Sequence, residues 1–138
     1  LISIAQGISK GVVYGNQGND TFYVNSGGVA KSTIYGGAGN DSLNIAANGA
    51  DSLLHVAGLG ADTFRVTGGL TDSTLYGDVS GSTVGGDDSI SIAGAASGSY
   101  IYANVGDDRV SLAAGLVEGS IYGGSGDDSV YLVAGAST

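Results

Sequence analysis

Six aspartates recur at a nearly fixed spacing, and their chemistry can be predicted before any element is assigned. Each ends a Gly-x-Asp triplet, and the intervals between them are 21, 21, 26, 20 and 20 residues. Carboxylates repeated at one position of a regular fold, with glycine carbonyls beside them, offer the oxygen ligands that Ca²⁺ accepts in irregular sets. The aspartates are Asp20, Asp41, Asp62, Asp88, Asp108 and Asp128.

The composition excludes several other chemistries. Only four residues are Lys or Arg and the net charge is -9, so the clustered positive charge that nucleic acid requires is missing. Cysteine is absent, which rules out disulfides and thiolate metal sites. No apolar run is long enough to predict a membrane span, and no signal peptide is evident at this N-terminus.

The segment after each turn alternates apolar and polar residues, which predicts a β-strand. The segments read "TFYV", "SLNI", "TFRV", "SISI", "RVSL" and "SVYL". A second strand precedes each turn, with Val13, Ile34, Leu54, Leu75, Ile101 and Ile121 as its inward column. We therefore expect a parallel β-solenoid of about six coils with two main strands per coil, in which equivalent side chains lie about 4.8 Å apart.

The repeats span residues 10–30, 31–50, 51–71, 72–97, 98–117 and 118–138 of a single array. The one long interval is explained by "YGDVSGSTVGGDD", which we interpret as a loop insertion. The first residues align with the second half of a repeat, so the chain is expected to be a piece of a longer array without a capping repeat.

Two turns carry a recognisable nonapeptide. Residues 36–44 and 123–131 fit G-G-x-G-x-D-x-U-x at every position, and the chain thereby resembles the RTX, or haemolysin-type, calcium-binding repeats. The resemblance implies a right-handed parallel β-roll with several Ca²⁺ ions held between the turns of successive coils. Its implied metal-binding residues are Gly15, Gly18, Asp20, Gly36, Gly39, Asn40, Asp41, Asp62, Asp88, Gly106, Asp107, Asp108, Gly123, Gly126, Asp127 and Asp128.

The other turns depart from the nonapeptide. Asn16 replaces the second glycine in the first turn, Ala103 and Asn104 replace both in the fifth, and the third turn is one residue longer. One such turn occurs per 20 or 21 residues, whereas rolls of the usual kind carry two per 18. We therefore expect metal along one edge only, while Asp51, Asp72 and Glu118 share the opposite, exposed bend with Lys10 and Lys31.

Electrostatics supports a cation independently of the resemblance. Two carboxylates about 5 Å apart repel by roughly 3 kcal/mol at an effective dielectric of 20, or roughly 1 kcal/mol in water. The alternative is that the aspartates only bond to local backbone amides, as Asp often does in turns, with solvent screening the repulsion.

One aromatic residue stands before each turn and is expected to point outward. The column could be a self-supporting ladder or a contact surface for lateral association, another subunit or a glycan. It comprises Tyr14, Tyr35, His55, Tyr76, Tyr102 and Tyr122, with His55 as a substitute ring.

No catalytic set is evident, although Arg65 or Arg109 beside an aspartate could be imagined in one, so we expect no enzymatic activity. Ranks of Thr for ice binding and internal Gln or Asn ladders for functional amyloid are also missing. The expected function is a structural or adhesive segment of an exported bacterial surface-layer, adhesin or filament protein, secreted by a type I system and folded by external Ca²⁺. Its expected partners are calcium, copies of itself end to end or laterally, and cell-surface glycans. The alternative is a secretion and folding module of a toxin, protease or lipase.

Overall fold

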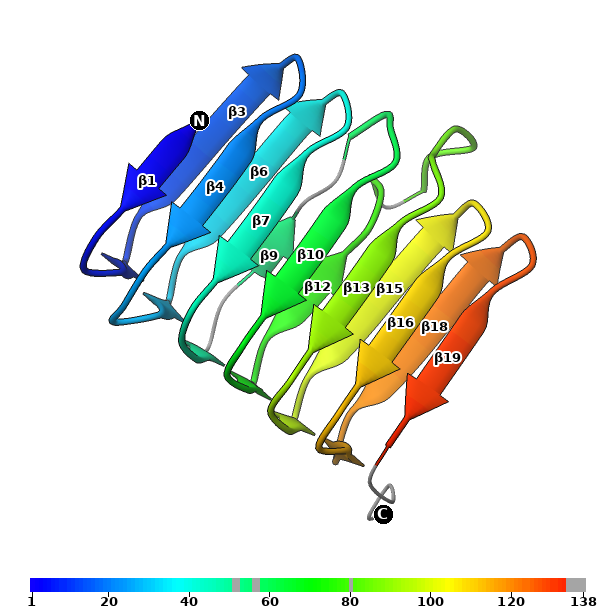
Figure 1. Cartoon of the computed structure of the whole chain (residues 1–138). Coiled ribbons are helices and arrows are strands. Elements are labelled where there is room, and N and C mark those ends of the chain that lie inside the picture. Colours follow the sequence, from blue (N-terminus) through cyan, green and yellow to red (C-terminus); the bar gives the residue numbers. More distant parts are fainter. Residues whose placement is uncertain (51–52, 56–57, 80, 134–138) are drawn as a thin grey trace.

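The computed structural model describes residues 1–50, 53–55, 58–79 and 81–133, with side chains given outside residues 49–57. All regular elements in this part are β-strands, and they form three parallel sheets of seven, six and six strands. Figure 1 shows the chain winding through the three sheets in turn, so that each coil lies on the previous one. The predicted all-β solenoid of about six coils is confirmed. None of the described segments forms a helix that could cross a membrane.

The first sheet, here called the front sheet, contains the strands that follow the aspartate turns. The six predicted segments form strands with the predicted bounds, and each pairs in register with its equivalent one coil away. An additional strand, β1, adds the first half-coil. The strands are β1 (Ile2–Ile4), β4 (Thr21–Val24), β7 (Ser42–Ile45), β10 (Thr63–Val66), β13 (Ser89–Ile92), β16 (Arg109–Leu112) and β19 (Ser129–Leu132).

The back sheet contains the strands that lead into the turns. Four of them are six residues long, whereas β9 and β12 have three, and β12 stops at Tyr76 because the insertion begins there. The strands are β3 (Val12–Gln17), β6 (Thr33–Ala38), β9 (Leu53–His55), β12 (Thr74–Tyr76), β15 (Tyr100–Val105) and β18 (Ser120–Ser125).

A third, short strand joins the two main strands at the end of each coil remote from the aspartates. Each has only two residues, too few for an alternating pattern to reveal it in the sequence. They are β2 (Ile8–Ser9), β5 (Val29–Ala30), β8 (Gly49–Ala50), β11 (Leu70–Thr71), β14 (Ala96–Ser97) and β17 (Leu116–Val117).

The core runs along the solenoid axis as stacked columns of aliphatic and aromatic side chains. Phe22, Leu43 and Phe64 on the front sheet are each at most 2% exposed, and Leu75 and Ile101 on the back sheet are fully buried. The predicted inward columns are confirmed over these coils, while Val130 in the last strand is 47% exposed. The side chain of Leu54 lies outside the described residues.

The bend opposite the aspartates is held by a repeated serine. Ser32, Ser73 and Ser99 are buried, and each hydroxyl donates to the carbonyl two residues earlier. Two of the hydroxyls also accept a backbone N–H from the preceding coil, Ser32 from Gly11 and Ser99 from Ser73. The residue before the serine has a left-handed backbone, as in Lys31 and Asp72, and these side chains are exposed as predicted. Asp51 lies outside the described residues.

Candidate metal centre along the turn edge

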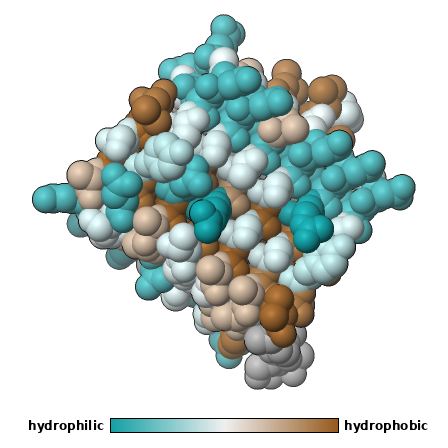
Figure 2. All heavy atoms as spheres, in the orientation of Figure 1, coloured by the Kyte–Doolittle hydropathy of each residue, from teal (hydrophilic) through white to brown (hydrophobic). Residues whose placement is uncertain are grey.

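The aspartate turns connect the back sheet to the front sheet and line one edge of the solenoid (Figure 1). In the second coil, for example, Gly39, Asn40 and Asp41 bridge β6 and β7. Figure 2 shows hydrophilic side chains gathered along this upper edge. The edge therefore concentrates the acidic residues on one side of the molecule, as the sequence predicts.

One carboxylate oxygen of every column aspartate after Asp20 accepts a hydrogen bond from the preceding coil. The backbone N–H of Asp41 donates to Oδ1 of Asp62, and the N–H of Asp62 donates to Oδ1 of Asp88, although the insertion separates the latter pair by 26 residues. The same bond joins Asp20 to Asp41, Asp88 to Asp108 and Asp108 to Asp128, and the five N···O distances lie between 2.6 and 3.1 Å. The column is therefore a continuous hydrogen-bonded ladder.

The other oxygen of four of these carboxylates, those of Asp41, Asp62, Asp88 and Asp108, is buried and has no hydrogen-bond partner. Oδ2 of Asp41, Asp62 and Asp88 is buried, and the whole residues are only 2% to 3% exposed. Leaving a buried polar atom unpaired costs about 1–3 kcal/mol, and more for a charged group. The unpaired buried oxygens are Oδ2 of Asp20, Asp41, Asp62, Asp88 and Asp108, together with Oδ1 of Asp78.

Glycine allows carbonyl oxygens to approach these carboxylates. A Cβ atom on Gly15 would lie less than 3.0 Å from both Asp20 Oδ2 and the carbonyl oxygen of Gly36 in the next coil. The same holds at Gly77, where Asp88 Oδ2 and the Ala103 carbonyl oxygen approach one point. A side chain at either position would fill the space between carboxylate and carbonyl. The turns thus bring together the two kinds of oxygen that Ca²⁺ takes as ligands.

Burial makes ionisation of the inner carboxylates unfavourable. It raises the pKa of Asp62 to about 7, that of Asp88 to about 8 and that of Asp108 to about 6, from an ordinary value of 3.8. The backbone N–H that each accepts lowers its pKa, and neighbouring carboxylates raise it further. Burial likewise raises the pKa of Asp41. A divalent cation would favour the charged forms and reverse this effect.

The residue before each aspartate forms a second, outer column that is exposed. The side-chain oxygens of Asn19 and Asn40 accept backbone N–H groups from the following coil, and those of Asp87 and Asp107 do the same. The bonds in this column run in the opposite direction along the solenoid to those of the inner column. The predicted ligands Asn40, Asp107 and Asp127 therefore lie on the rim, apart from the buried oxygens.

The predicted ligand set is thus divided between two environments. Asp20, Asp41, Asp62, Asp88 and Asp108 share the ladder with unpaired oxygens, and Asp128 ends it in a partly exposed position. Gly15 and Gly123 lie against the carboxylates of Asp20 and Asp128. A Cβ atom on Gly39, Gly106 or Gly126 would lie less than 3.0 Å from the equivalent carbonyl oxygen of the preceding coil. These carbonyl oxygens belong to Gly18, Gly86 and Gly106, respectively.

Among the described residues, no three carboxylate or imidazole side chains converge on one point. A cation at this edge would therefore be held by one or two carboxylates and by backbone carbonyls such as that of Gly36. This donor set fits a hard, oxygen-binding ion that tolerates irregular coordination. Bound Ca²⁺ would supply positive charge to the unpaired oxygens and a link between consecutive coils.

Asp78 is a buried acid that was not included in the predicted ligand set. It opens the insertion and stands two residues after Tyr76, where the regular turns have Asn16, Asn104 or a glycine. It is 0% exposed. The sequence does show that Asp78 places an acidic residue where the regular turns have a neutral one. The burial of Asp78 could not be predicted, because the sequence does not give the path of the insertion.

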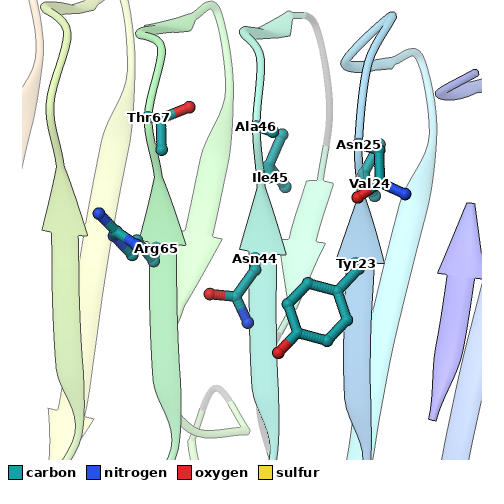
Figure 3. Close-up of a pocket in the computed structure, with 8 residues that line it drawn as sticks. All are labelled: Tyr23, Val24, Asn25, Asn44, Ile45, Ala46, Arg65 and Thr67. Carbon is teal, nitrogen blue, oxygen red and sulfur yellow. The ribbon is translucent and has the colours of Figure 1, made fainter. Parts of the chain in front are cut away.

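Two further surface features lie away from the turn edge. On the back sheet, the tyrosine column is stacked, with ring centroids 5.0 Å apart for Tyr14 and Tyr35 and for Tyr76 and Tyr102, and 4.9 Å apart for Tyr102 and Tyr122. On the front sheet, a groove crosses β4, β7 and β10 (Figure 3). Its lining includes the outward side chains of Tyr23, Asn44 and Arg65. The side chain of His55 lies outside the described residues.

Comparison with known protein families gives one match. Residues 12–28, 26–53 and 120–138 match the RTX calcium-binding nonapeptide repeat, in four copies. The matched segments include the turns of Asp20, Asp41 and Asp128. Comparisons with curated proteins and with solved structures gave no match.

Proposed function

We infer that this chain, a member of the RTX calcium-binding repeat family, binds several Ca²⁺ ions along its aspartate edge and depends on them for a stable fold. RTX repeats indicate a secreted, extracellular calcium-binding protein. The proposal adds the location of the ions, between the turns of successive coils. It also adds a role for the segment outside the cell.

The observation that carries the proposal is the column of unpaired, buried carboxylate oxygens. The carboxylates of Asp41, Asp62, Asp88 and Asp108 already use Oδ1 to accept a backbone N–H, so Oδ2 is the oxygen left for a cation. Solvent cannot screen these groups as it would at an exposed turn, because Asp41, Asp62 and Asp88 are almost completely buried. This argues against aspartates that only cap their turns.

Dependence on Ca²⁺ gives a mechanism for export. At the low Ca²⁺ concentration of the cytosol, repulsion within the column opposes stacking and keeps the acidic chain unfolded. At millimolar external Ca²⁺ the ions neutralise the column, and their binding free energy becomes folding free energy. The chain would thus be secreted unfolded, by a type I system, and would fold outside a bacterial cell.

We assign the folded segment a structural or adhesive role in a surface-layer, adhesin or filament protein, without catalysis. The solenoid is a rigid spacer, because every coil is bonded to the next through three sheets, the serine bend and the aspartate ladder. The tyrosine column, exposed at Tyr14 and Tyr122 and half-buried between them, supplies an aromatic strip for lateral contacts with copies of the chain or with glycans. The competing assignment is a secretion and folding module of a toxin, protease or lipase.

Calorimetric titration tests the proposal. Chain stripped of metal with EGTA and then freed of chelator should bind more than one Ca²⁺ per molecule, with an affinity little changed by millimolar Mg²⁺ because Mg²⁺ requires a stricter octahedron. A chain that binds no Ca²⁺, or that binds Mg²⁺ equally well, would refute it. Analytical ultracentrifugation of the Ca²⁺-loaded chain separates the roles, since an assembling segment should sediment as oligomers and a folding module as a monomer.

A further inference from the structure

Asp78 sits at a point where the fourth coil differs from every regular coil. The insertion follows β12, and its loop extends beyond the neighbouring turns before the chain enters β13 (Figure 1). Gly77 and Asp78, its first residues, are nevertheless buried. The insertion therefore adds a carboxylate to the inside of the turn edge while its remainder projects outward.

The position of Asp78 is fixed by the next coil. Oδ2 accepts the backbone N–H of Val105 at 3.2 Å, and the main-chain carbonyl oxygen of Asp78 accepts Nδ2 of Asn104 at 2.9 Å. Oδ1 is buried and has no hydrogen-bond partner, although the residue is 0% exposed. Asp78 thus repeats the division seen in the ladder, with one oxygen bonded to a neighbouring coil and one left unpaired.

Several further oxygens gather around the same rung. A Cβ atom on Gly85 would lie less than 3.0 Å from Asp78 Oδ2 and from the Val105 carbonyl oxygen. At Gly77, which precedes Asp78, the corresponding atoms are Asp88 Oδ2 and the Ala103 carbonyl oxygen. The fourth rung therefore holds two buried carboxylates with unpaired oxygens, where a regular rung holds one.

The basic residue that borders the next rung is turned to the front sheet. Arg109 follows Asp108 in sequence, but its guanidinium carbon lies 4.4 Å from the ring centre of Tyr131 on the front sheet. Burial raises the pKa of Asp78, whereas hydrogen bonding to the backbone of Val105 and Gly86 lowers it. The charge of Asp78 in turn raises the pKa of Asp62, Asp88 and Asp108. A second negative charge on this rung thus acts on three members of the ladder.

We propose that Asp78 and Asp88 together bind one Ca²⁺ at a site created by the insertion, with the carbonyl oxygens of Ala103 and Val105 as further ligands. The nonapeptide does not supply this site, because Asp78 occupies a position that is Gly or Asn in the regular turns. The inference rests on the proposed calcium binding of the edge. Two carboxylates should make this the tightest site of the array.

The test compares three forms of the full 138-residue chain by Ca²⁺ calorimetry. Asp78→Asn removes the charge and keeps an oxygen that can accept from Val105. Asp87→Asn is the matched control, since it removes the same charge from the same turn on the exposed rim, where Asn19 and Asn40 already occur. Asp78→Asn should lose the tightest binding event and lower the stoichiometry by about one ion, while Asp87→Asn retains both. Unchanged tightest affinity and stoichiometry in Asp78→Asn would overturn the proposal.

A second measurement uses the unmodified chain, so it does not depend on whether Asp78→Asn folds. Anomalous scattering from crystals of the unmodified chain grown with Ca²⁺ should give a peak between the carboxylates of Asp78 and Asp88. Peaks at the regular rungs with none here would overturn this inference alone and indicate a protonated structural carboxyl at Asp78. A chain without peaks at any rung would instead refute the calcium-binding function on which the inference rests.

Discussion

The backbone N–H of Asp20 donates to Oδ1 of Asp41, one coil further along, at 2.8 Å, while Oδ2 of Asp41 is buried without a partner. The two oxygens of one carboxylate therefore have different structural roles. Oδ1 joins coils regardless of charge, whereas Oδ2 contributes negative charge that a cation must offset. Substitutions that remove the charge alone can be distinguished from substitutions that remove the whole group.

Asp41→Asn should therefore stabilise the fold without Ca²⁺ and destabilise it with Ca²⁺. The amide oxygen still accepts the N–H of Asp20, and the neutral side chain relieves repulsion in the column, so at pH 8 in EGTA the variant should show more strand signal than the unmodified chain. In excess Ca²⁺ the variant should instead melt at a lower temperature than the unmodified chain, because a ligand charge is lost. Circular dichroism in EGTA measures the first effect, and thermal unfolding in Ca²⁺ measures the second.

Asp41→Ala and Asp72→Asn complete this comparison. Asp41→Ala also leaves the Asp20 amide unpaired, which should cost the Ca²⁺-loaded fold about 1–3 kcal/mol more. Asp72→Asn lies on the exposed opposite bend and should change neither the strand signal in EGTA nor the melting temperature in Ca²⁺ by a similar amount. Equal effects of Asp41→Asn and Asp72→Asn on the Ca²⁺-induced stabilisation would contradict a metal edge confined to the turns.

The stability of the metal-free fold should decrease as the pH rises. The folded-state pKa values of Asp108, Asp62 and Asp88 are raised to about 6, about 7 and about 8, above their ordinary value of 3.8, so the folded state binds more protons than the unfolded chain. Their stabilising contribution is complete below about pH 4 and is lost between there and pH 8. In EGTA the strand signal should therefore fall from about pH 4 to pH 8, and denaturant titrations measure the stability at those pH values where the metal-free chain is still folded.

Ca²⁺ should invert that dependence, because the ion competes with protons for the same carboxylates. Ca²⁺ affinity is expected to rise from pH 5 to pH 8. A metal-free chain that becomes more stable over the same interval would show that the buried aspartates are ionised and satisfied by the protein itself.

Substitutions of Gly37 and Gly18 distinguish two reasons why the turns contain glycine, the left-handed backbone and the close approach of the neighbouring coil. Both have a left-handed backbone, with φ of +112° and +99°. A Cβ on Gly37 would collide with the Asn16 carbonyl oxygen, whereas a Cβ on Gly18 would meet nothing within 4 Å. Gly18→Ala should cost about 1–2 kcal/mol from the backbone alone. Gly37→Ala should cost about 1–3 kcal/mol more in denaturant unfolding with Ca²⁺; equal costs would mean that close stacking of the turns is unimportant.

Much of this fold could be predicted because the alternation of apolar and polar residues, which is weak evidence in one short segment, recurs in every repeat. A single segment such as "SLNI" is ambiguous, but six aligned copies establish period two, the inward face and the register between coils, and the structure confirms all three. The aspartate column follows from the same alignment. The aromatic column was predicted in this way as well, and its stacked spacing is confirmed for the described tyrosines.

Features fixed by side-chain direction or by an irregular path could not be predicted. The buried serines of the opposite bend resemble any polar turn residue in sequence, and only the structure shows that the Ser99 hydroxyl accepts the backbone N–H of Ser73 in the preceding coil. The sequence also does not show that Asp107 is exposed on the rim while its neighbour Asp108 is buried. Asp78 was hidden within an insertion that has no equivalent in the other coils.

The tyrosine column provides a test of whether aromatic stacking stabilises the coil. Tyr102 has Tyr76 and Tyr122 stacked at 5.0 and 4.9 Å, whereas Tyr14 at the first coil stacks on Tyr35. Because a stacked pair contributes about 0.5–1.5 kcal/mol, Tyr102→Ser should destabilise the Ca²⁺-loaded chain about twice as much as Tyr14→Ser. Denaturant unfolding at saturating Ca²⁺ measures the difference. A negligible effect of Tyr102→Ser, with altered sedimentation, would indicate an assembly surface instead.

The most direct test is the far-ultraviolet circular dichroism of the chain at pH 8 during addition of Ca²⁺ after removal of metal. Strand signal should be weak in chelator, should appear as Ca²⁺ approaches millimolar concentration, and should disappear again with excess EGTA. Full strand signal in chelator, unchanged by Ca²⁺, would contradict a fold held together by cations at its aspartate edge.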